Sequence, residues 1–401
     1  MKSMSGNVIA EPWGTLCGVR PVKRVADMLR EGQSHETIRE SLRNAFGISD
    51  ERISLALSIA ERELVLTKNL GMKEIALYID IPFCPTRCTY CAFASFDAKQ
   101  MQQYAEPYLA ALYRELELGG KIVKDLGFTV RSVYIGGGTP TTLLSIELDN
   151  LLYKISQTFD LSSVTEFCVE AGRPDTITED KLSVMSERGV TRISINPQTI
   201  HEKTLKRIGR KHTPEAVFDA ACLAKKQNFS VINMDVIAGL PGETPEDFIE
   251  TLKAVEAARP ENITVHTMSI KRASNLKGVF EPTKEAHAGA AKMLDFAYRF
   301  LDETGYLPYY LYRQKHMVGS LENTGFALPG TECLYNIGMM QELMTVMGFG
   351  VGSVTKLVRP GRIERIFNVR DLTEYLNRQE EMRNRKQYMY TFFSQETDIL
   401  K

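Results

Sequence analysis

Apolar residues recur at two different spacings along the chain, and the change between them divides the sequence. In residues 34–46, Ile38, Leu42 and Phe46 fall on one helical face behind Ser34, a residue type that favours helix N-termini. Residues 50–66 repeat this helical spacing. Residues 1–72 are therefore predicted to form a helical N-terminal segment.

From residue 73 onwards, short β-rich runs alternate with longer helical patterns. Six strands are predicted, over residues 74–81, 131–135, 165–170, 191–195, 231–237 and 262–268. Helices are predicted between them, over residues 101–118, 145–158, 178–187, 214–227 and 245–257. This alternation predicts an α/β fold around a parallel sheet, either doubly wound or a partial barrel. In both folds, ligands bind at the carboxyl ends of the strands.

The last part of the chain has a different sequence pattern. A helix is predicted near residues 284–304, and the sequence then becomes irregular and rich in tyrosine, glycine and methionine. We interpret residues 73–280 as the α/β core and residues 281–401 as a smaller domain that covers the substrate.

The composition excludes several classes of protein. With 43% apolar and 25% charged residues, the chain has the composition of an ordinary globular protein. A net charge of −1 produces no overall field that would favour nucleic acid, so no nucleic-acid partner is expected. No apolar run approaches the ~20 residues that a membrane span needs, and the N-terminus lacks the apolar region of a signal peptide. An odd number of cysteines, seven, favours a reducing, cytoplasmic location over a disulfide framework.

Three of the cysteines follow the first predicted strand within eight positions, as Cys84, Cys88 and Cys91. Three thiolates on one short loop can bind one inorganic centre. Zinc prefers four ligands, usually as two separated pairs, whereas an iron–sulfur cluster can keep one iron open for a substrate. The spacing therefore favours such a cluster, with a structural zinc site as the alternative. The remaining cysteines are interpreted mostly as small buried residues: Cys17, Cys168, Cys222 and Cys333.

Glycines and polar residues stand where the later predicted strands end. The motif GGGTP at 136–140 would let a ligand approach the backbone closely and offer N–H groups to an anion, although an ordinary turn is the alternative. Glu170 ends the third strand, Gln198 follows the fourth, Arg210 follows a short helix after it, and Asp235 lies near the end of the fifth. Such groups could hold an amino group, a carboxylate and a ribose.

Together these motifs resemble a known family. The cysteine triplet, with Tyr90 before its last member, resembles the radical S-adenosylmethionine (SAM) signature. GGGTP, the strand-end glutamate, INPQ, IGRKH and DVIAGLPGE resemble, in that order, the oxygen-independent coproporphyrinogen III dehydrogenase family. WGTLCGVRP and the stretch from PYYLYRQK to CLYNIGMM are similar to its HemZ-type branch. The resemblance covers nearly the whole chain.

The resemblance implies a fold and two cofactors. The fold would be a partial (β/α)6 radical SAM barrel, with a helical N-terminal extension and a smaller mixed α/β C-terminal domain. Cys84, Cys88 and Cys91 would ligate a 4Fe-4S cluster, whose open iron would bind the amino and carboxylate groups of SAM. The positions that match the family's SAM contacts are Tyr78, Gly137, Gly138, Thr139, Glu170, Gln198, Arg210, Asp235 and Ser269.

The resemblance also implies a reaction. A reduced cluster would cleave SAM to a 5′-deoxyadenosyl radical, which takes hydrogen from propionate side chains of coproporphyrinogen III. Loss of CO2 and one electron leaves vinyl groups, giving protoporphyrinogen IX, and an electron donor such as flavodoxin or ferredoxin would be needed. Basic and aromatic residues that suit an anionic tetrapyrrole, or form only a solvated basic edge, are Lys271, Arg272, Tyr310, Arg313 and Lys315.

One position leaves the reaction open. Phe93 stands where dehydrogenases of the family carry a further cysteine and where haem-chaperone relatives carry phenylalanine. Three functions therefore remain: a coproporphyrinogen III dehydrogenase, a haem-binding chaperone without decarboxylase activity, and another radical SAM enzyme acting on haem. The HemZ-like C-terminal stretch favours the first over the third. No catalytic side chain is identified from the sequence.

Overall fold

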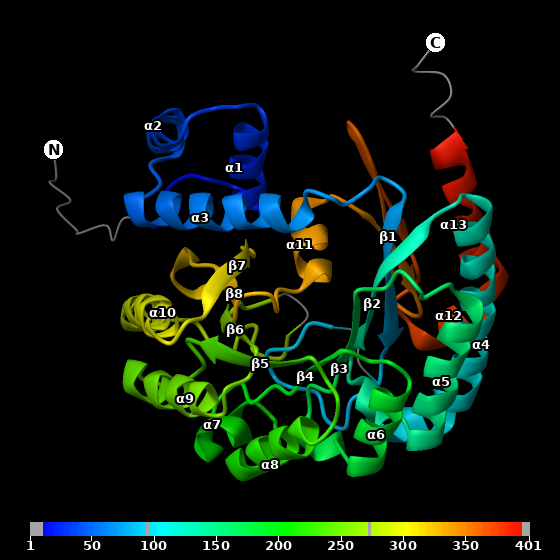
Figure 1. Ribbon diagram of the computed structural model, residues 1–401. Coiled ribbons are helices and arrows are strands. Elements are labelled where there is room, and N and C mark those ends of the chain that lie inside the picture. Colours follow the sequence, from blue (N-terminus) through cyan, green and yellow to red (C-terminus); the bar gives the residue numbers. More distant parts are fainter. Residues whose placement is uncertain (1–10, 94–95, 272–273, 395–401) are drawn as a thin grey trace, which may run out of the picture.

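Six parallel strands form the centre of one strongly curved sheet (Figure 1). The computed structural model describes residues 11–93, 96–271 and 274–394. Each central strand pairs in parallel with the next along the chain. All six predicted strands are confirmed, with bounds that differ from the predicted ones by two residues or fewer. They are β1 (Glu74–Ile81), β2 (Thr129–Gly137), β3 (Glu166–Glu170), β4 (Arg192–Ser194), β5 (Val231–Ala238) and β6 (Asn262–Thr267).

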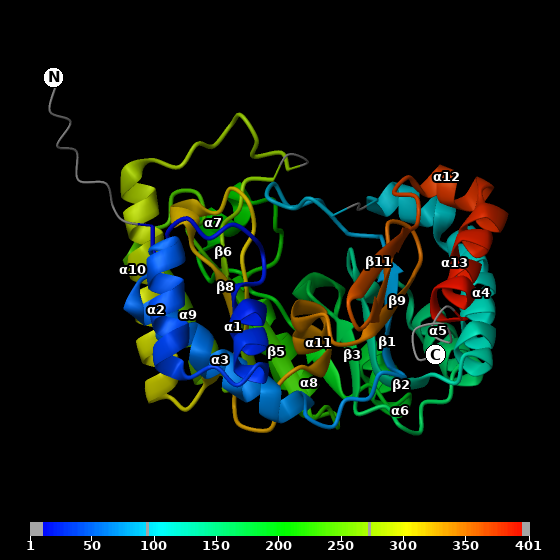
Figure 2. The same ribbon diagram turned by 90° about the horizontal axis from the view of Figure 1, so that it is seen from above.

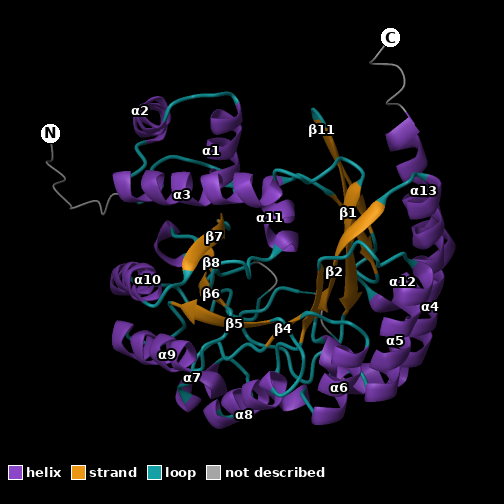
Figure 3. Cartoon of the chain, in the orientation of Figure 1, coloured by secondary structure: helices purple, strands orange, loops and turns teal. Residues whose placement is uncertain are grey.

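Helices surround the convex face of this sheet (Figure 3). They are α4 (Ala98–Asp125), α5 (Ser145–Thr158), α6 (Glu179–Glu187), α7 (Glu202–Arg207), α8 (Pro214–Lys225) and α9 (Pro245–Ala257). The prediction for α4 was too short at its C-terminal end, where two glycines favoured a stop. The helix continues through Gly119, and the glycine lets α4 pack closely against Phe349. A Cβ at this position would lie 2.4 Å from the Phe349 ring.

Residues 281–401 complete the sheet at both edges. The strand order is β11-β10-β9-β1-β2-β3-β4-β5-β6-β8-β7, with β9 parallel to β1 and β8 antiparallel to β6. The mixed α/β C-terminal region that the resemblance implies is confirmed, but its individual strands were not predicted, because β8 and β9 are buried along their whole length and show no alternation of apolar and polar residues. The elements are α10 (Lys284–Glu303), β7 (Leu307–Tyr312), β8 (Asn323–Ala327), α11 (Leu334–Gln341), β9 (Thr345–Phe349), β10 (Val354–Arg359), β11 (Arg362–Phe367), α12 (Leu372–Asn377) and α13 (Gln379–Ser394).

The N-terminal helices pack against the β7 edge and α11 (Figure 2). These helices are α1 (Pro21–Arg30), α2 (His35–Phe46) and α3 (Asp50–Thr67), and Ser34 caps α2 as predicted. A buried carboxylate, Glu322, ties them to the sheet. It accepts a hydrogen bond from Trp13 Nε1 at 2.7 Å and lies 3.0 Å from Arg52 Nε. The helical segment is therefore part of the barrel wall.

Two further predictions concern the burial of the four other cysteines and the absence of a membrane span. Cys168 and Cys333 are buried as expected, whereas Cys17 and Cys222 are exposed, on a turn and on α8 respectively. No helix within the described ranges is both long and apolar enough to cross a membrane.

A second buried carboxylate links α3 to α11. Gln341 Nε2 donates to Glu63 Oε2, while Oε1 of each residue has no hydrogen-bond partner in the described part of the chain. A proton on Glu63 would let the carboxyl donate to the Gln341 oxygen and satisfy both atoms. Burial raises the pKa of Glu63 to about 8, which agrees with a neutral carboxyl at neutral pH.

We expect Glu63→Gln to remove a pH dependence of stability. The folded pKa lies above the ordinary value of 4.5, so the folded state holds the extra proton and wild-type stability falls as the pH rises from about 4.5 to 8. The loss should reach roughly 3–5 kcal/mol. Urea unfolding of both proteins at pH 5 and pH 8 should show the variant gaining relative stability at the higher pH. If the two proteins differ in free energy of unfolding by the same amount at both pH values, Glu63 is not neutral in the folded state.

Candidate active site

The three clustered cysteines lie on a loop that leaves the carboxyl end of β1. Backbone hydrogen bonds close this loop at its base, where Cys84 N donates to Phe96 O at 2.9 Å and Phe96 N donates to Pro82 O at 2.8 Å. Farther along, Thr89 N donates to Ile208 O at 3.0 Å, which holds the loop against the end of α7. The loop is thus fixed at two places around Cys84, Cys88 and Cys91.

A buried arginine that the sequence analysis missed holds the middle of the cysteine loop. Arg173, only 3% exposed, donates from Nη1 to the carbonyl oxygen of Thr86 at 3.2 Å and to its hydroxyl at 3.1 Å. The same nitrogen lies 3.9 Å from Cys88 Sγ, and Asp175 accepts two further hydrogen bonds at 2.9 Å. The one signal in the sequence is a charged residue three positions after Glu170.

The glycines of GGGTP allow two backbone segments to meet. Gly137 has φ +107°, and a Cβ there would lie 2.5 Å from Asp80 Oδ2. A Cβ on Gly138 would lie 2.6 Å from the carbonyl oxygen of Phe83. The expectation that N–H groups here face an anion is wrong for two of them, since Thr139 N donates to Phe83 O at 2.8 Å and Gly138 N to the end of β1. These groups support the cysteine loop.

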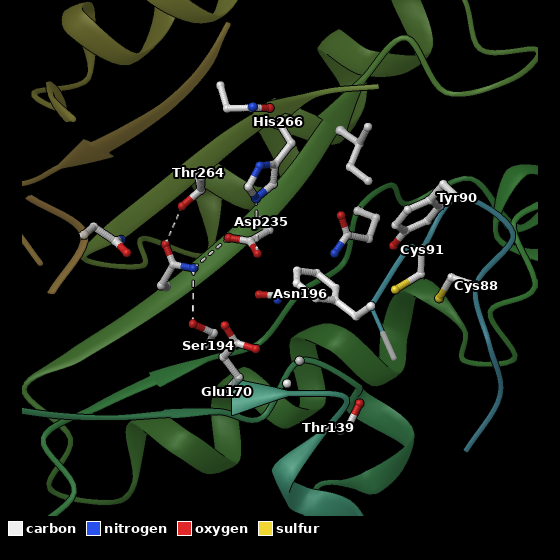
Figure 4. A pocket seen from close by; sticks show the side chains of 18 of the residues that line it. Cys88, Tyr90, Cys91, Thr139, Glu170, Ser194, Asn196, Asp235, Thr264 and His266 are labelled. Atoms are coloured by element: carbon white, nitrogen blue, oxygen red, sulfur yellow. Dashed lines mark hydrogen bonds and ion pairs between the residues drawn. The ribbon is translucent and has the colours of Figure 1, made fainter. Parts of the chain in front are cut away.

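The strand-end residues predicted to meet do line one cavity with the cysteine loop. The cavity has a volume of about 400 Å³, and Figure 4 shows its side chains converging from several strands. Their common place follows from the parallel sheet, whose strands all end at the same edge. The predicted residues that line it are Cys84, Cys88, Cys91, Gly137, Gly138, Thr139, Glu170, Gln198, Arg210, Asp235, Ser269, Lys271 and Tyr310.

Glu170 and Asp235 differ in the direction of their pKa shifts, although both carboxylates are partly buried. Burial raises the pKa of Glu170 to about 7. A hydrogen bond of 2.5 Å from the Tyr134 hydroxyl acts in the opposite direction and offsets part of this rise. Burial also acts on Asp235, but hydrogen bonds outweigh it and hold its pKa below the usual value. Asn233 Nδ2 donates to Asp235 Oδ1 at 2.8 Å, and His266 Nε2 lies 3.5 Å from Oδ2 (Figure 4).

Gln198, Arg210 and Asn196 present polar atoms that this chain does not satisfy. Gln198 has φ +66°, a strained conformation for a residue with a side chain, which costs about 1–3 kcal/mol. Its Oε1, the Asn196 Oδ1 and the Arg210 Nε are buried without a hydrogen-bond partner among the residues described. Arg210 is held by its Nη1, which donates to the Asn196 carbonyl oxygen at 2.5 Å. Buried groups of this kind are rare in native proteins, and a polar ligand would satisfy them.

The residues present fit an iron–sulfur cluster and SAM. Burial raises the pKa of the Cys84 thiol to about 11, and the neighbouring Cys91 and Cys88 add to this effect, so the three thiols lie within electrostatic range. In the described part of the chain, no three Cys, His, Asp or Glu side chains are placed to hold a single metal ion. Each thiolate of a four-iron cluster binds a different iron, so such a cluster accepts wider spacing than one ion. The unsatisfied polar atoms beside it suit a zwitterionic cofactor.

The deeper part of the cavity is lined mainly by tyrosines and by α11. The rings of Tyr134 and Tyr335 stack with centroids 4.4 Å apart, and those of Tyr309 and Tyr310 lie 4.9 Å apart. The Glu166 carboxylate accepts hydrogen bonds from the first backbone N–H groups of α11 and so holds this helix inside the barrel. This part of the cavity therefore offers aromatic surface together with tyrosine hydroxyl groups.

Four predicted residues are placed elsewhere. Tyr78 lies behind the cavity wall and donates from its hydroxyl to Asp80 Oδ2 at 3.2 Å. Arg313 donates to the carbonyl oxygen of Leu16 at 2.8 Å and lies over the ring of Trp13, so its charge serves the N-terminal segment. Lys315 is exposed and is not among the described residues that line the cavity. Arg272 lies outside the described residues.

Comparison with known proteins agrees with this site. The model of the Radical SAM superfamily matches residues 78–255. The chain is 39% identical over 396 residues to the oxygen-independent coproporphyrinogen-III oxidase-like protein HemZ of Bacillus subtilis (strain 168), spanning 97% of this chain and 79% of that protein. It is 32% identical over 273 residues to the heme chaperone HemW of Lactococcus lactis subsp. lactis (strain IL1403), spanning 66% of this chain and 65% of that protein.

A solved structure has the same fold. The coproporphyrinogen III oxidase HemN from Escherichia coli, described as a radical SAM enzyme, superposes with a TM-score of 0.62 over 77% of this chain and 70% of that one. Its sequence identity of 22% means that this match supports the fold alone.

Proposed function

The chain belongs to the family of oxygen-independent coproporphyrinogen-III oxidase-like proteins within the radical SAM superfamily, and from this premise we propose that it oxidatively decarboxylates coproporphyrinogen III. Radical SAM domains in general imply a 4Fe-4S cluster and SAM. One observation carries the proposal: the three cysteines and four strand-end polar residues line one cavity whose depth is covered by tyrosines.

Each part of the site has a role in this proposal. Cys84, Cys88 and Cys91 would hold the cluster, which when bound supplies the electron that cleaves SAM for hydrogen abstraction. Glu170 would accept hydrogen bonds from the SAM amino group, and Asp235 those of a ribose hydroxyl. Arg210, Gln198 and Asn196 offer the remaining polar contacts, matching their unsatisfied atoms. The enclosed cavity limits access of water to the reacting groups.

The substrate would occupy the tyrosine-lined depth of the cavity. Each of two propionate groups loses a hydrogen atom to the radical derived from SAM, one electron to an external electron acceptor, and CO2, which leaves a vinyl group and gives protoporphyrinogen IX. Tyr310, Tyr335 and Asn336 would face the macrocycle and its polar edge. At the mouth, Lys271 is the predicted cation that the structure brings to the cavity, where it would attract a propionate.

One experiment tests this function. The cluster is reconstituted without oxygen, and SAM, a reductant and coproporphyrinogen III are added. Release of CO2 and formation of the vinyl product are expected. Cys88→Ser should lose the cluster and the activity together, so a variant that keeps both would show that the ligand assignment is wrong.

A haem-binding chaperone is the second candidate, because of one residue. Phe93, at the family position of a further cysteine, is 60% exposed at the cavity mouth, and its ring lies 5.6 Å from Lys271 Nζ. An exposed ring beside a cation would suit the face and carboxylate of a haem. Stoichiometric haem binding together with SAM cleavage but no CO2 release would favour this candidate over the dehydrogenase.

Binding of SAM should depend on the protonation of Glu170. Burial raises the pKa of its carboxyl to about 7, so below that pH it is largely neutral and accepts hydrogen bonds from the SAM amino group more weakly. The affinity for SAM should therefore rise as the pH increases through about 7 and then level off. Equilibrium binding of labelled SAM between pH 6 and pH 8.5 measures this rise, and Glu170→Gln should bind weakly at every pH. A wild-type affinity that does not change with pH would exclude a titrating Glu170.

A further inference from the structure

The chain immediately behind the cysteine loop is strongly basic. Residues 202–213 contain five lysines and arginines and one glutamate, although the whole chain has a net charge of −1. Arg210 points into the cavity, but the other four cations of this stretch are exposed. With the exposed Arg87 of the cysteine loop they form what we call the basic face: Arg87, Lys203, Lys206, Arg207 and Lys211.

The wall between the basic face and the cysteines is one backbone segment thick. Gly209 has φ +79°, and a Cβ on it would lie 3.2 Å from the Arg87 carbonyl oxygen and 3.8 Å from the Cα of Cys88. Thr86 Oγ1 donates to the Gly209 carbonyl oxygen at 3.0 Å, which keeps the two segments together. A partner that rests on Gly209 would therefore approach the Cys88 backbone closely.

The contacts of the cations in residues 203–211 leave most of their charge uncompensated. Lys206 forms an exposed i,i+4 pair with Glu202 at 3.3 Å, which contributes little to stability. Arg207 donates to the carbonyl oxygen of Pro241 at 2.6 Å and keeps its charge, because a carbonyl is neutral. Asp247 of α9 lies within electrostatic range of Lys203, so with Glu202 two acids oppose the five cations of this face. The face thus keeps an excess of positive charge.

We propose that the basic face is the docking site of an acidic one-electron carrier protein that reduces the cluster. This inference rests on the proposed radical SAM function of the cavity. One electron passes from the reduced carrier to the cluster, so the carrier is oxidised by one electron, the cluster is reduced by one, and no bond or proton changes place. SAM and the tetrapyrrole would occupy the cavity on the opposite side of the cysteine loop, which leaves this face open to a protein.

Charge complementarity would act mainly on the rate of encounter. Opposite charges steer association and can raise its rate by ten- to a thousandfold at low salt. Electron-transfer encounters also bury small areas, which the short stretch 202–213 with Arg87 can supply. Four cations of this face, Lys203, Lys206, Arg207 and Lys211, are not among the described residues that line the cavity, so their removal should leave the cluster intact.

The test uses a double reversal of charge in the reconstituted holoenzyme. Lys203→Glu with Lys211→Glu should slow reduction of the cluster by reduced flavodoxin about tenfold or more at low ionic strength, followed by stopped-flow absorbance and the EPR signal of the reduced cluster. The difference should shrink as salt is added. Reduction by dithionite, which needs no docking site, should match that of the wild type.

A matched control changes the net charge equally at another place. Lys121→Glu with Lys124→Glu alters two exposed positions of α4 and should be reduced by flavodoxin at nearly the wild-type rate. The docking site is excluded if the basic-face variant is reduced as fast as this control, or if it is equally slow with dithionite. A wild-type protein that holds no cluster reducible by dithionite would instead overturn the proposed function itself, and the docking site with it.

Discussion

Replacing Arg173 with alanine is expected to leave the barrel folded while most of the iron–sulfur cluster is lost. Arg173 makes two hydrogen bonds to Thr86 in the middle of the cysteine loop and one longer contact to Cys88 Sγ. Hydrogen bonds from a charged group contribute about 1.5–3 kcal/mol each. Without them, the loop would have to be ordered by the cluster itself, which should weaken cluster retention roughly a hundredfold.

The measurement is iron and sulfide per chain after anaerobic reconstitution, with circular dichroism to confirm the fold. Arg173→Lys is the matched control, because lysine keeps the charge but cannot bind both Thr86 and the two oxygens of Asp175. We expect an intermediate cluster content and an altered EPR signal for this variant. A full complement of iron in Arg173→Ala would mean that the loop does not depend on Arg173.

The second large effect concerns the packing of the C-terminal helix. Lys386 of α13 lies 3.1 Å from Glu115 of α4, and both side chains are at most 2% exposed. Glu115 also accepts hydrogen bonds from the Tyr375 hydroxyl at 2.7 Å and Asn368 Nδ2 at 2.8 Å. Lys386→Met should lower the free energy of unfolding by about 3–5 kcal/mol, because it leaves a buried carboxylate without its cation.

A second substitution shows whether charge is the cause. Adding Glu115→Gln to Lys386→Met removes the unpaired charge and should recover much of the lost stability in urea unfolding. The glutamine oxygen can replace Oε2, which accepts from Tyr375, but its NH2 group cannot accept from Asn368 as Oε1 does, so the recovery should be incomplete. If the double variant is as unstable as Lys386→Met, the loss comes from packing around Phe349, whose ring the Lys386 ammonium group faces at 4.2 Å.

Local patterns predicted the core of the barrel well. β1 and α5 have the predicted bounds, because their apolar spacing and flanking residues are properties of consecutive residues. The C-terminal strands were missed for the opposite reason. β9 pairs with β1, from which it is separated by more than half of the chain, and it is buried throughout. Such a strand forms only because a distant partner is already in place, and its sequence shows no alternation.

The same distinction holds for the site. Three cysteines on one loop are neighbours in sequence, and residues at the ends of parallel strands meet at one edge, so the sequence by itself determined that the cysteines and the strand-end polar residues line one cavity. The sequence could not determine which groups the long side chains contact. Arg313, predicted beside the substrate, instead binds the Leu16 carbonyl oxygen 297 positions away.

Only the tertiary structure decided how the site is supported and closed. Arg173 reaches the cysteine loop across 87 positions, and Tyr335 enters the cavity because α11 is held inside the barrel by Glu166. The exposed face behind Cys88 likewise exists because the chain around Gly209 packs against the cysteine loop. These contacts join residues far apart in the chain, and they form because burial and hydrogen bonding select among many possible pairings. The residues proposed to carry the chemistry could therefore be identified from the sequence, whereas the residues that support them required the fold.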